Sequence, residues 1–238
     1  MSRIPKVIHY CWFGNNPKPE IVNKCINTWK IKMPDYTIKE WNEDNFKIAD
    51  FKFAIDAYEK KKWAFVADYC RLWVLYNYGG IYLDTDMEIL HDLTPFTCNE
   101  AFTGVEDSEN IAFGIWGCKP GDQFIKEILD YYDTIDFKNY TDDLFEIAMP
   151  NVITKLAKDK GYKPPKSGGK SVFNNLTVYS NELFYPKRSS WQEAVITENT
   201  FTIHHYEGSW KTPTQILRTR TKKKIINIVR KLMGKESV

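Results

Sequence analysis

The hydrophobic pattern of the first ninety residues predicts strands and helices in alternation. The expected strands are residues 6–14, 36–41 and 81–83. Between them, one helix is expected from Pro19, which can occupy a first helical turn, to the residue before Pro34. Apolar residues at helical spacing predict a second helix in residues 62–78, ended by two glycines. This alternation is typical of α/β proteins.

The rest of the pattern continues the same fold. Further strands are expected in residues 101–105, 111–118, 176–180 and 201–206. A helix opened by Pro120 is predicted in residues 120–132, and a helical segment with a break at Pro150 in residues 142–161. No repeat or low-complexity linker interrupts the pattern. We therefore expect one Rossmann-like α/β domain over residues 1–210, with a mixed, mostly parallel sheet flanked by helices.

Composition narrows the class of protein. A chain of 238 residues with 43% hydrophobic residues can bury a sizeable core. No apolar run reaches 18 residues, so no transmembrane helix is expected, and the N-terminal apolar stretch is too short for a signal peptide. The five cysteines are odd in number, scattered and without a CxxC pair, which favours reduced thiols in a cytoplasmic protein and argues against zinc.

Charge is distributed unevenly along the chain. Residues 211–238 carry nine of the 33 Lys and Arg but one of the 31 Asp and Glu, so the tail has a net charge of +8 and residues 1–210 have −6. Residues 218–235 are predicted to form a basic amphipathic helix. Such a helix can bind an anionic membrane surface, such as the inner face of a cell membrane. The alternative is that it packs its apolar stripe on the domain. RNA binding is disfavoured because no aromatic residues interleave the charges.

Two aspartates at the end of a predicted buried strand, in the stretch GGIYLDTDMEIL, are the first sign of chemistry. In extended chain Asp84 and Asp86 point to the same side, where their charges repel each other. A divalent cation with hard oxygen ligands removes this repulsion, and substrate phosphates commonly complete the shell of Mg²⁺ or Mn²⁺. The position also fits ligand binding at the carboxyl ends of strands in α/β sheets.

Other interpretations of the two aspartates remain open at this point. An EF-hand loop counted from Asp84 needs Gly at its sixth position, where the chain has Ile89. Phosphatases of the haloacid dehalogenase type also have Asp-x-Asp after an apolar strand, and Asp84 would then be the nucleophile. They have Thr or Val four residues after that Asp, where this chain has Glu88. Both acids are also common turn or cap residues.

An ion pair is predicted one helix earlier. Asp68 and Arg71 are three residues apart, so they are neighbours on one helical face, and both are embedded among bulky apolar residues. Because burying charges is costly, the pair is expected either to have a task at the site or to form a tight structural ion pair.

Three separated stretches together resemble the DxD sugar transferases of glycosyltransferase family 32. They are IPKVIHYCWFG at the start, ADYCRLWVLYNYGGIYLDTD in the middle and IHHYEGSW at residues 203–210. The nearest types are bacterial capsular-polysaccharide enzymes, and the stretches are also similar to the catalytic domain of large clostridial glucosylating toxins. The resemblance implies a GT-A fold, a nucleotide-sugar donor with Mn²⁺ or Mg²⁺, and retention of anomeric configuration.

The resemblance also implies roles for individual residues. Asp84 and Asp86 would hold the metal, ribose and diphosphate, and Asp68 and Arg71 would contact the donor sugar. His9, Trp12 and Gly14 would line the nucleotide, and Ser209 and Trp210 would close over the diphosphate. His204 or His205 would bind the metal or a phosphate, and His204 is preferred. His9 is equally consistent with a core histidine bonded to backbone.

Two departures from the family are visible. Tyr206 stands where relatives often have Trp, and Met149-Pro150 stands where they often have Gly-Pro. The sequence thus predicts a retaining, metal-dependent glycosyltransferase that moves a hexose, from a UDP-sugar for preference, to a growing surface glycan or lipid-linked oligosaccharide such as capsule or O-antigen. The alternatives are a metal-dependent phosphohydrolase and a non-enzymatic binder of sugar nucleotides.

Overall fold

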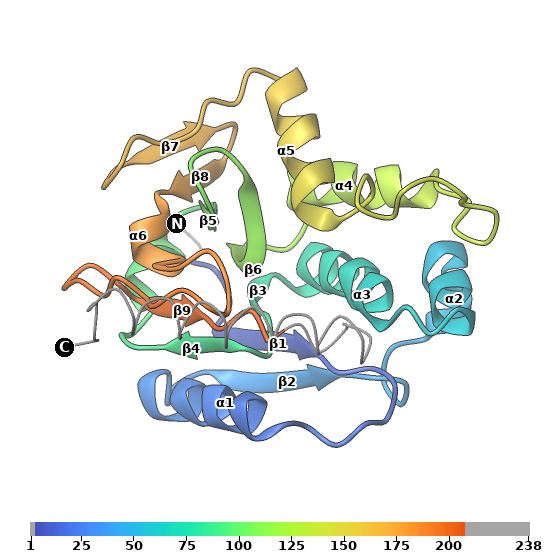
Figure 1. Cartoon of the computed structure of the whole chain (residues 1–238), viewed down its shortest axis with the longest axis horizontal. Helices are drawn as coiled ribbons and strands as arrows, with labels where there is room; N and C mark the ends of the chain where they lie inside the picture. The colour runs from blue at the N-terminus through green and yellow to red at the C-terminus, as the bar shows by residue number, and fades with distance from the viewer. Residues whose placement is uncertain (1–2, 208–238) are drawn as a thin grey trace, which may run out of the picture.

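A seven-stranded sheet forms the centre of the protein, whose structure is a computed structural model that describes residues 3–207 (Figure 1). Its strands are β1 (Val7–Cys11), β2 (Thr37–Trp41), β3 (Gly80–Leu83), β5 (Ala101–Val105), β6 (Ile111–Cys118), β7 (Lys170–Phe173) and β8 (Leu176–Tyr179). The order is β2-β1-β3-β6-β5-β8-β7, and five strands run in one direction while β6 and β7 oppose them. The sheet is therefore mixed and mostly parallel, as predicted.

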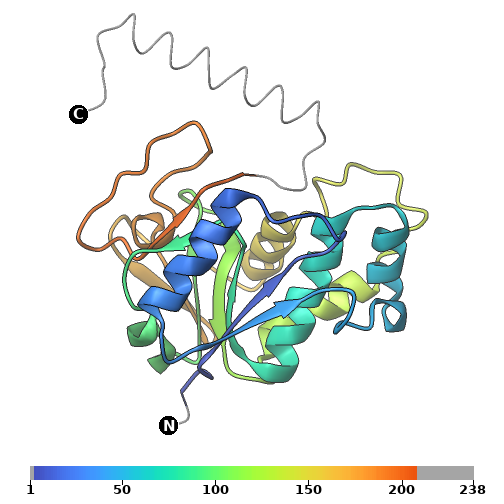
Figure 2. The same cartoon turned by 90° about the horizontal axis from the view of Figure 1, so that it is seen from below.

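Helices cover both faces of this sheet. They are α1 (Glu20–Lys32), α2 (Lys52–Glu59), α3 (Trp63–Tyr78), α4 (Gln123–Asp133), α5 (Met149–Asp159) and α6 (Asn181–Phe184), with 3₁₀ turns η1 (Ile48–Asp50) and η2 (Thr94–Cys98). A separate antiparallel pair, β4 (Met87–Ile89) and β9 (Thr202–His204), lies beside α1. One core cluster joins α2, α3, α4 and α5 to the sheet, and the other joins α1, α6 and β4 to its opposite face. Figure 2 shows α1 and β2 nearest to the viewer, with α2 and α3 beyond them.

Alternation along β3 explains how one strand serves both faces. Tyr82 belongs to the cluster under α3, whereas Ile81 and Leu83 belong to the cluster under α1. All four residues of this strand are buried, and it lies between β1 and β6. The strand ends where the buried core ends, so the next residue, Asp84, lies at the carboxyl end of β3 at the edge of the sheet formed by the strand ends.

Two helices begin at residues other than those predicted from nearby prolines. The fourth helix begins at Gln123, not at Pro120, because the side chain of Asp122 accepts a hydrogen bond from the Ile125 amide at 2.9 Å and caps the helix. The fifth helix begins at Met149, so Pro150 lies in its first turn and does not break it, and residues 142–148 form turns. Proline lacks an amide hydrogen, which costs nothing in a first turn.

Several short elements were not predicted, among them α2, β4 and β7. Three or four residues are too few to show a hydrophobic period, so these strands are defined by their partners: β4 by β9 and β7 by β8. Residues 3–207 contain no helix that is long and apolar enough to cross a membrane. The predicted tail segments 211–238 and 218–235 lie outside the described residues.

Candidate active site

Asp84 lies at the point where β3 turns toward β4. Its amide donates to the carbonyl of Gly114 at 2.8 Å, and its own carbonyl accepts from the Met87 amide at 2.9 Å, which closes a tight turn. A Cβ atom at residue 114 would lie 3.4 Å from the Asp84 Oδ2 atom and 3.1 Å from the Tyr185 hydroxyl. Glycine at this position of β6 therefore leaves room for the carboxylate.

Asp86 is fixed from the other side, by the strand β9. The register pairs Met87 with His204, and this brings the His204 Nε2 atom to 3.1 Å from Asp86 Oδ1. The amide of Glu207 donates to Asp86 Oδ2 at 2.9 Å. Burial alone would raise the pKa of Asp86, but His204 and these hydrogen bonds outweigh it and hold the pKa at about 2. Asp86 is thus a buried carboxylate that keeps its charge.

Asp84, Asp86 and His204 converge on one point. Each offers a ligand atom, and these atoms all lie within 4.8 Å of one another. The Nδ1 atom of His204 is buried and has no hydrogen-bond partner among residues 3–207. Two carboxylate oxygens and an imidazole nitrogen form a donor set that fits a divalent cation such as Mn²⁺ or Mg²⁺.

The neighbouring His205 faces away from this cluster. Its Nε2 atom lies 2.8 Å from Glu88 Oε2, and the Lys24 ammonium lies 3.8 Å from the other Glu88 oxygen. Adjacent residues on a strand point to opposite sides, so only one histidine of the pair can meet the aspartates. In this structure that residue is His204.

Arg71 joins the cluster to α3. Its guanidinium donates to Asp84 Oδ1 at 3.1 Å and to Asp68, and it lies 4.8 Å from the centre of the Tyr82 ring. The Tyr82 hydroxyl also donates to Asp84 Oδ1, at 3.2 Å. Burial raises the pKa of Asp68 to about 6, against the pull of Arg71. The sequence-predicted ion pair is thus present and continues directly into the DxD motif.

The loop after β1 lies at the same edge, because β1 and β3 are parallel neighbours. The Trp12 indole donates to the Asn16 carbonyl at 2.7 Å, and the Gly14 amide donates to Glu43 at 2.7 Å. Gly14 has a φ of 95°, and a Cβ atom there would lie 2.9 Å from the Trp63 ring. Trp63 is partly buried, packs against the core cluster of α2 and α3, and borders this loop.

His9 lies in the core, beneath this edge. Its Nε2 atom is 2.9 Å from the Gly79 carbonyl, and its Nδ1 atom accepts from the Trp41 indole at 3.1 Å. Both ring nitrogens are therefore used by the protein, as expected of a neutral core histidine. Burial, first of all, lowers the pKa of His9 from 6.5 to about 4.

Acidification is expected to destabilise the protein through His9. The unfolded chain binds a proton at this residue below pH 6.5 and the folded protein only near pH 4, so stability is lost as pH falls through that window. At pH 5 the expected loss is about 2 kcal/mol of unfolding free energy relative to pH 8. Urea unfolding at the two pH values measures it. His9→Gln should remove this share of the difference, whereas His91→Gln, at an exposed position, should not; equal pH dependence in all three proteins would contradict the assignment.

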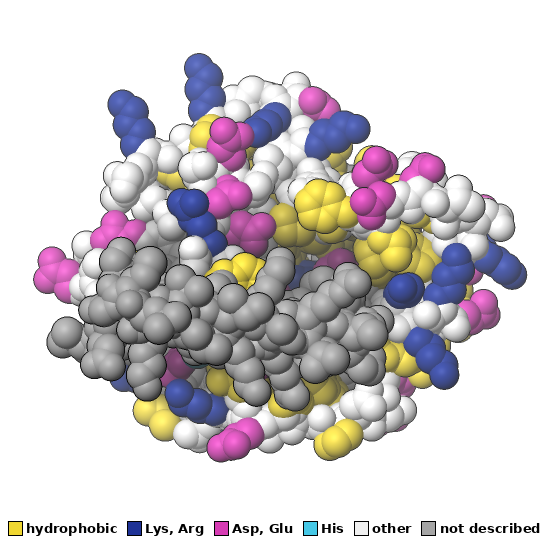
Figure 3. All heavy atoms as spheres, in the orientation of Figure 1, with side chains coloured by type: hydrophobic (Ala, Val, Ile, Leu, Met, Phe, Trp, Pro, Cys, Tyr) yellow, Lys and Arg dark blue, Asp and Glu magenta, His cyan; other side chains and the backbone are white. Residues whose placement is uncertain are grey.

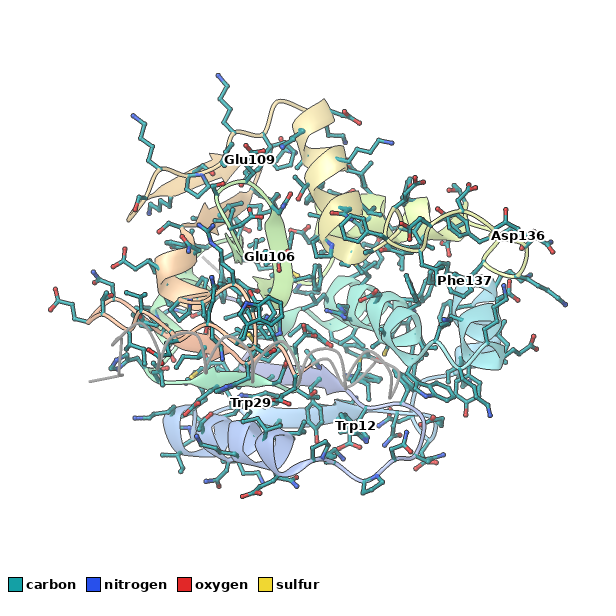
Figure 4. All side chains as sticks on the ribbon, in the orientation of Figure 1. Trp12, Trp29, Glu106, Glu109, Asp136 and Phe137 are labelled. Atoms are coloured by element: carbon teal, nitrogen blue, oxygen red, sulfur yellow. The ribbon has the colours of Figure 1, made fainter. Side chains whose placement is uncertain are left out.

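Two further side chains lie at the site, and the sequence analysis gave a role to neither. Glu106 directly follows β5, and Tyr206 follows β9; the charge of Glu106 interacts with those of His204 and Asp84. No sequence signal marks Glu106, because it is a single acid after an ordinary strand. Figure 4 labels it near the centre of the molecule, whereas Glu109 of the same turn lies toward β7. Ser209 and Trp210 lie outside the described residues.

The face that carries this site combines charged and apolar groups. Figure 3 shows Lys, Arg, Asp and Glu side chains close to hydrophobic side chains around the middle of the molecule. The mixed sheet, the DxD turn at its edge and the helices on both faces fit the GT-A fold that the sequence resemblance predicted.

Comparison with known proteins finds a family match for part of the chain. Residues 19–103 match the family described as "Glycosyltransferase sugar-binding region containing DXD motif". The region includes the ion pair of α3 and both aspartates of the DxD turn. This part of the chain is therefore similar to the sugar-binding region of the DXD glycosyltransferases, in line with the resemblance of the sequence motifs.

Relatives and solved structures agree with this placement. The chain is 29% identical over 135 residues to inositol phosphoceramide mannosyltransferase 3 of Schizosaccharomyces pombe (54% of this chain, 37% of that protein). It is 27% identical over 133 residues to mannosyl phosphorylinositol ceramide synthase CSH1 of Saccharomyces cerevisiae (53% and 34%). The match thus spans about a third of the length of these relatives. The structure titled "PaToxG Glycosyltransferase" shares the fold, with a TM-score of 0.55, 17% identity and coverage of 67% of this chain and 70% of that one.

Proposed function

We propose that this protein is a metal-dependent glycosyltransferase that moves a hexose from a nucleotide sugar, a UDP-sugar for preference, to a growing glycan. The observation that carries the proposal is the convergence of Asp84, Asp86 and His204 beside the buried Arg71–Asp68 pair. Retention of anomeric configuration is part of the proposal and rests on the resemblance of the three sequence motifs to retaining transferases.

The chemistry of the site supports the proposal. Breaking a sugar–diphosphate bond puts negative charge on the departing phosphate, and groups that meet this charge where it develops lower the barrier. A bound Mn²⁺ or Mg²⁺ supplies charge neutralisation of this kind. Arg71 offers a fixed fork of donors that is already oriented by Asp68 and Asp84. We assign no general base, because in retaining transferases the acceptor can enter on the face of the leaving group.

The names of the relatives bear on the acceptor. Both act, by name, in the mannosylation of inositol phosphoceramide, which is a lipid. We infer that this protein likewise uses a lipid-linked or surface glycan, as in capsule or O-antigen assembly, on the cytoplasmic face of a membrane. The basic stretch 218–235 would supply contact with anionic lipid.

Nucleotide binding tests the proposed function. Thermal unfolding with UDP, GDP and CDP, each with and without Mn²⁺, is expected to show the largest rise in Tm with UDP plus Mn²⁺. A ligand that binds the folded state at 100 times its Kd stabilises by about 2.7 kcal/mol, which corresponds to a rise of roughly 5–10 °C for a chain of this size. The reason is that Asp84 and Asp86 would hold a cation whose charge neutralises that of the diphosphate.

Each alternative predicts another outcome. A larger shift with GDP would replace the UDP-sugar by a GDP-sugar, in keeping with the mannosyltransferase relatives. Release of phosphate from simple phosphoesters, with Asp84 trapped as a phospho-aspartate, would favour the phosphohydrolase. Nucleotide binding without donor hydrolysis would favour the non-enzymatic binder. No shift with any nucleotide would defeat all but the phosphohydrolase.

A further inference from the structure

Glu106 lies at the same sheet edge as the DxD turn. Its strand, β5, runs in the direction of β3, and β6 separates the two. At the usual spacing of strands, the backbones after β3 and β5 are about 10 Å apart. The register of β5 shifts between Thr103 and Val105, immediately before Glu106. Irregularities of this kind commonly re-aim the next side chains.

Hydrogen bonds within the turn hold the backbone of Glu106, whereas none is made by its carboxylate among the described residues. Asp107 accepts hydrogen bonds from the Glu109 amide at 2.7 Å and the Asn110 amide at 2.8 Å, and the Glu106 amide donates to the Asn110 carbonyl at 3.0 Å. Among residues 3–207, no donor reaches the partly buried carboxylate of Glu106. Its charge is close enough to those of His204 and Asp84 to interact with them, which agrees with its place after β5 at the same sheet edge.

Tyr206 presents a second unused polar group next to Glu106. Its backbone has a φ of 57°, which is uncommon for a residue with a large side chain and is found where a site requires it. The centre of the Tyr206 ring lies 4.0 Å from that of the His204 ring, with the two planes tilted by 37°. The Tyr206 hydroxyl is buried and without a partner among the described residues, and it interacts electrostatically with Glu106.

We propose that Glu106 and Tyr206 form a hydroxyl-binding subsite beside the Asp84, Asp86 and His204 cluster, and that it receives a sugar hydroxyl of the acceptor. A carboxylate accepts a hydrogen bond from such a hydroxyl, and a phenol can donate or accept one. The carboxylate of Glu106 would repel a phosphate, so the pair suits a neutral hydroxyl better than a phosphate. The subsite therefore deepens the proposed function and rests on it.

Position favours the acceptor over the nucleotide. The loop at Trp12 and Gly14 follows β1, on one side of β3, whereas Glu106 follows β5, on the other side. Arg71 and Asp68 reach the cluster from α3, but Tyr206 reaches it from the β9 segment on the opposite face of the sheet. A diphosphate at the aspartates with its nucleoside toward β1 would leave the Glu106 side for the incoming sugar.

Acceptor kinetics with isosteric variants test the subsite. We would measure donor consumption alone, and in the presence of octyl glucoside, octyl galactoside or octyl mannoside as acceptor probes. Glu106→Gln should lower kcat/KM for the best probe by about 10- to 100-fold, and Tyr206→Phe by about 2- to 10-fold, in line with loss of charged and neutral hydrogen bonds. Donor hydrolysis without acceptor should stay within about 2-fold of the wild type.

The controls separate failure of the subsite from failure of the proposed function. Glu109→Gln makes the same change on the same turn, at an exposed residue paired with Lys158 at 2.9 Å, and should leave all rates unchanged. Three results would overturn the subsite: an equal fall of hydrolysis and transfer in the Glu106 and Tyr206 variants, no change of either rate in them, or no acceptor-dependent turnover by the wild type. The proposed transferase function would still stand in these cases if nucleotide stabilises the wild type. Loss of nucleotide stabilisation in the wild type would overturn both.

Discussion

Asp86→Asn is expected to abolish Mn²⁺-dependent stabilisation by nucleotide and to lower sugar transfer on the order of 100-fold or more. Asn has the shape of Asp and can still accept from the Glu207 amide, but its amide oxygen is a weaker ligand and carries no charge. The variant also leaves His204 without the anionic partner that lies 3.1 Å away. Thermal melting with nucleotide and Mn²⁺, together with a donor-consumption assay, measures both effects.

A matched substitution shows whether the loss is local. Asp136→Asn changes the same group on an exposed loop, where the carboxylate accepts from the Asn139 side chain at 2.8 Å, and Figure 4 shows it far from Glu106. This control should behave as the wild type in both assays. If Asp86→Asn retained the Mn²⁺-dependent shift, the Asp–Asp–His cluster would not be the cation site.

The edge of the sheet that carries the DxD turn could be predicted because its signals are local. An apolar run between two glycines and two aspartates leaves few alternatives for β3, and the helical period before it is long enough to define α3. The choice between the two histidines could be posed from sequence, since neighbours on a strand diverge. It could not be answered, because the answer depends on which residue of β9 pairs with Met87.

What the sequence missed depends on contacts between distant segments. Glu106 becomes notable only when the sheet order brings β5 near β3, and Tyr206 only when its backbone turns the ring onto His204. The helical segments predicted from residues 120 and 142 begin instead at Gln123 and Met149. The capping side chain of Asp122 was overlooked in the first, and in the second Pro150 was taken as a break although it lies in the first turn. Sequence patterns therefore predicted the strands next to Asp84, Asp86 and His204, but not the side chains of Glu106 and Tyr206 around them.

Arg71→Met is expected to lower the free energy of unfolding by about 3–5 kcal/mol, the usual cost of removing one partner of a buried ion pair. Arg71 is buried between two carboxylates, and methionine fills much of its volume without its charge. The loss leaves Asp68 desolvated without an opposite charge, and it frees Asp84 to repel Asp86. Urea unfolding in the absence of nucleotide and metal measures the change.

The double variant and a surface control identify the cause of that loss. Adding Asp68→Asn to Arg71→Met removes the stranded charge and should recover a large part of the stability, which lost packing alone would not allow. Lys158→Met breaks an exposed pair with Glu109 and should cost about 1 kcal/mol or less. If Arg71→Met cost no more than this surface change, the ion pair on α3 would contribute little to the fold. Its position between Asp68 and Asp84 would then have to be explained by donor binding alone.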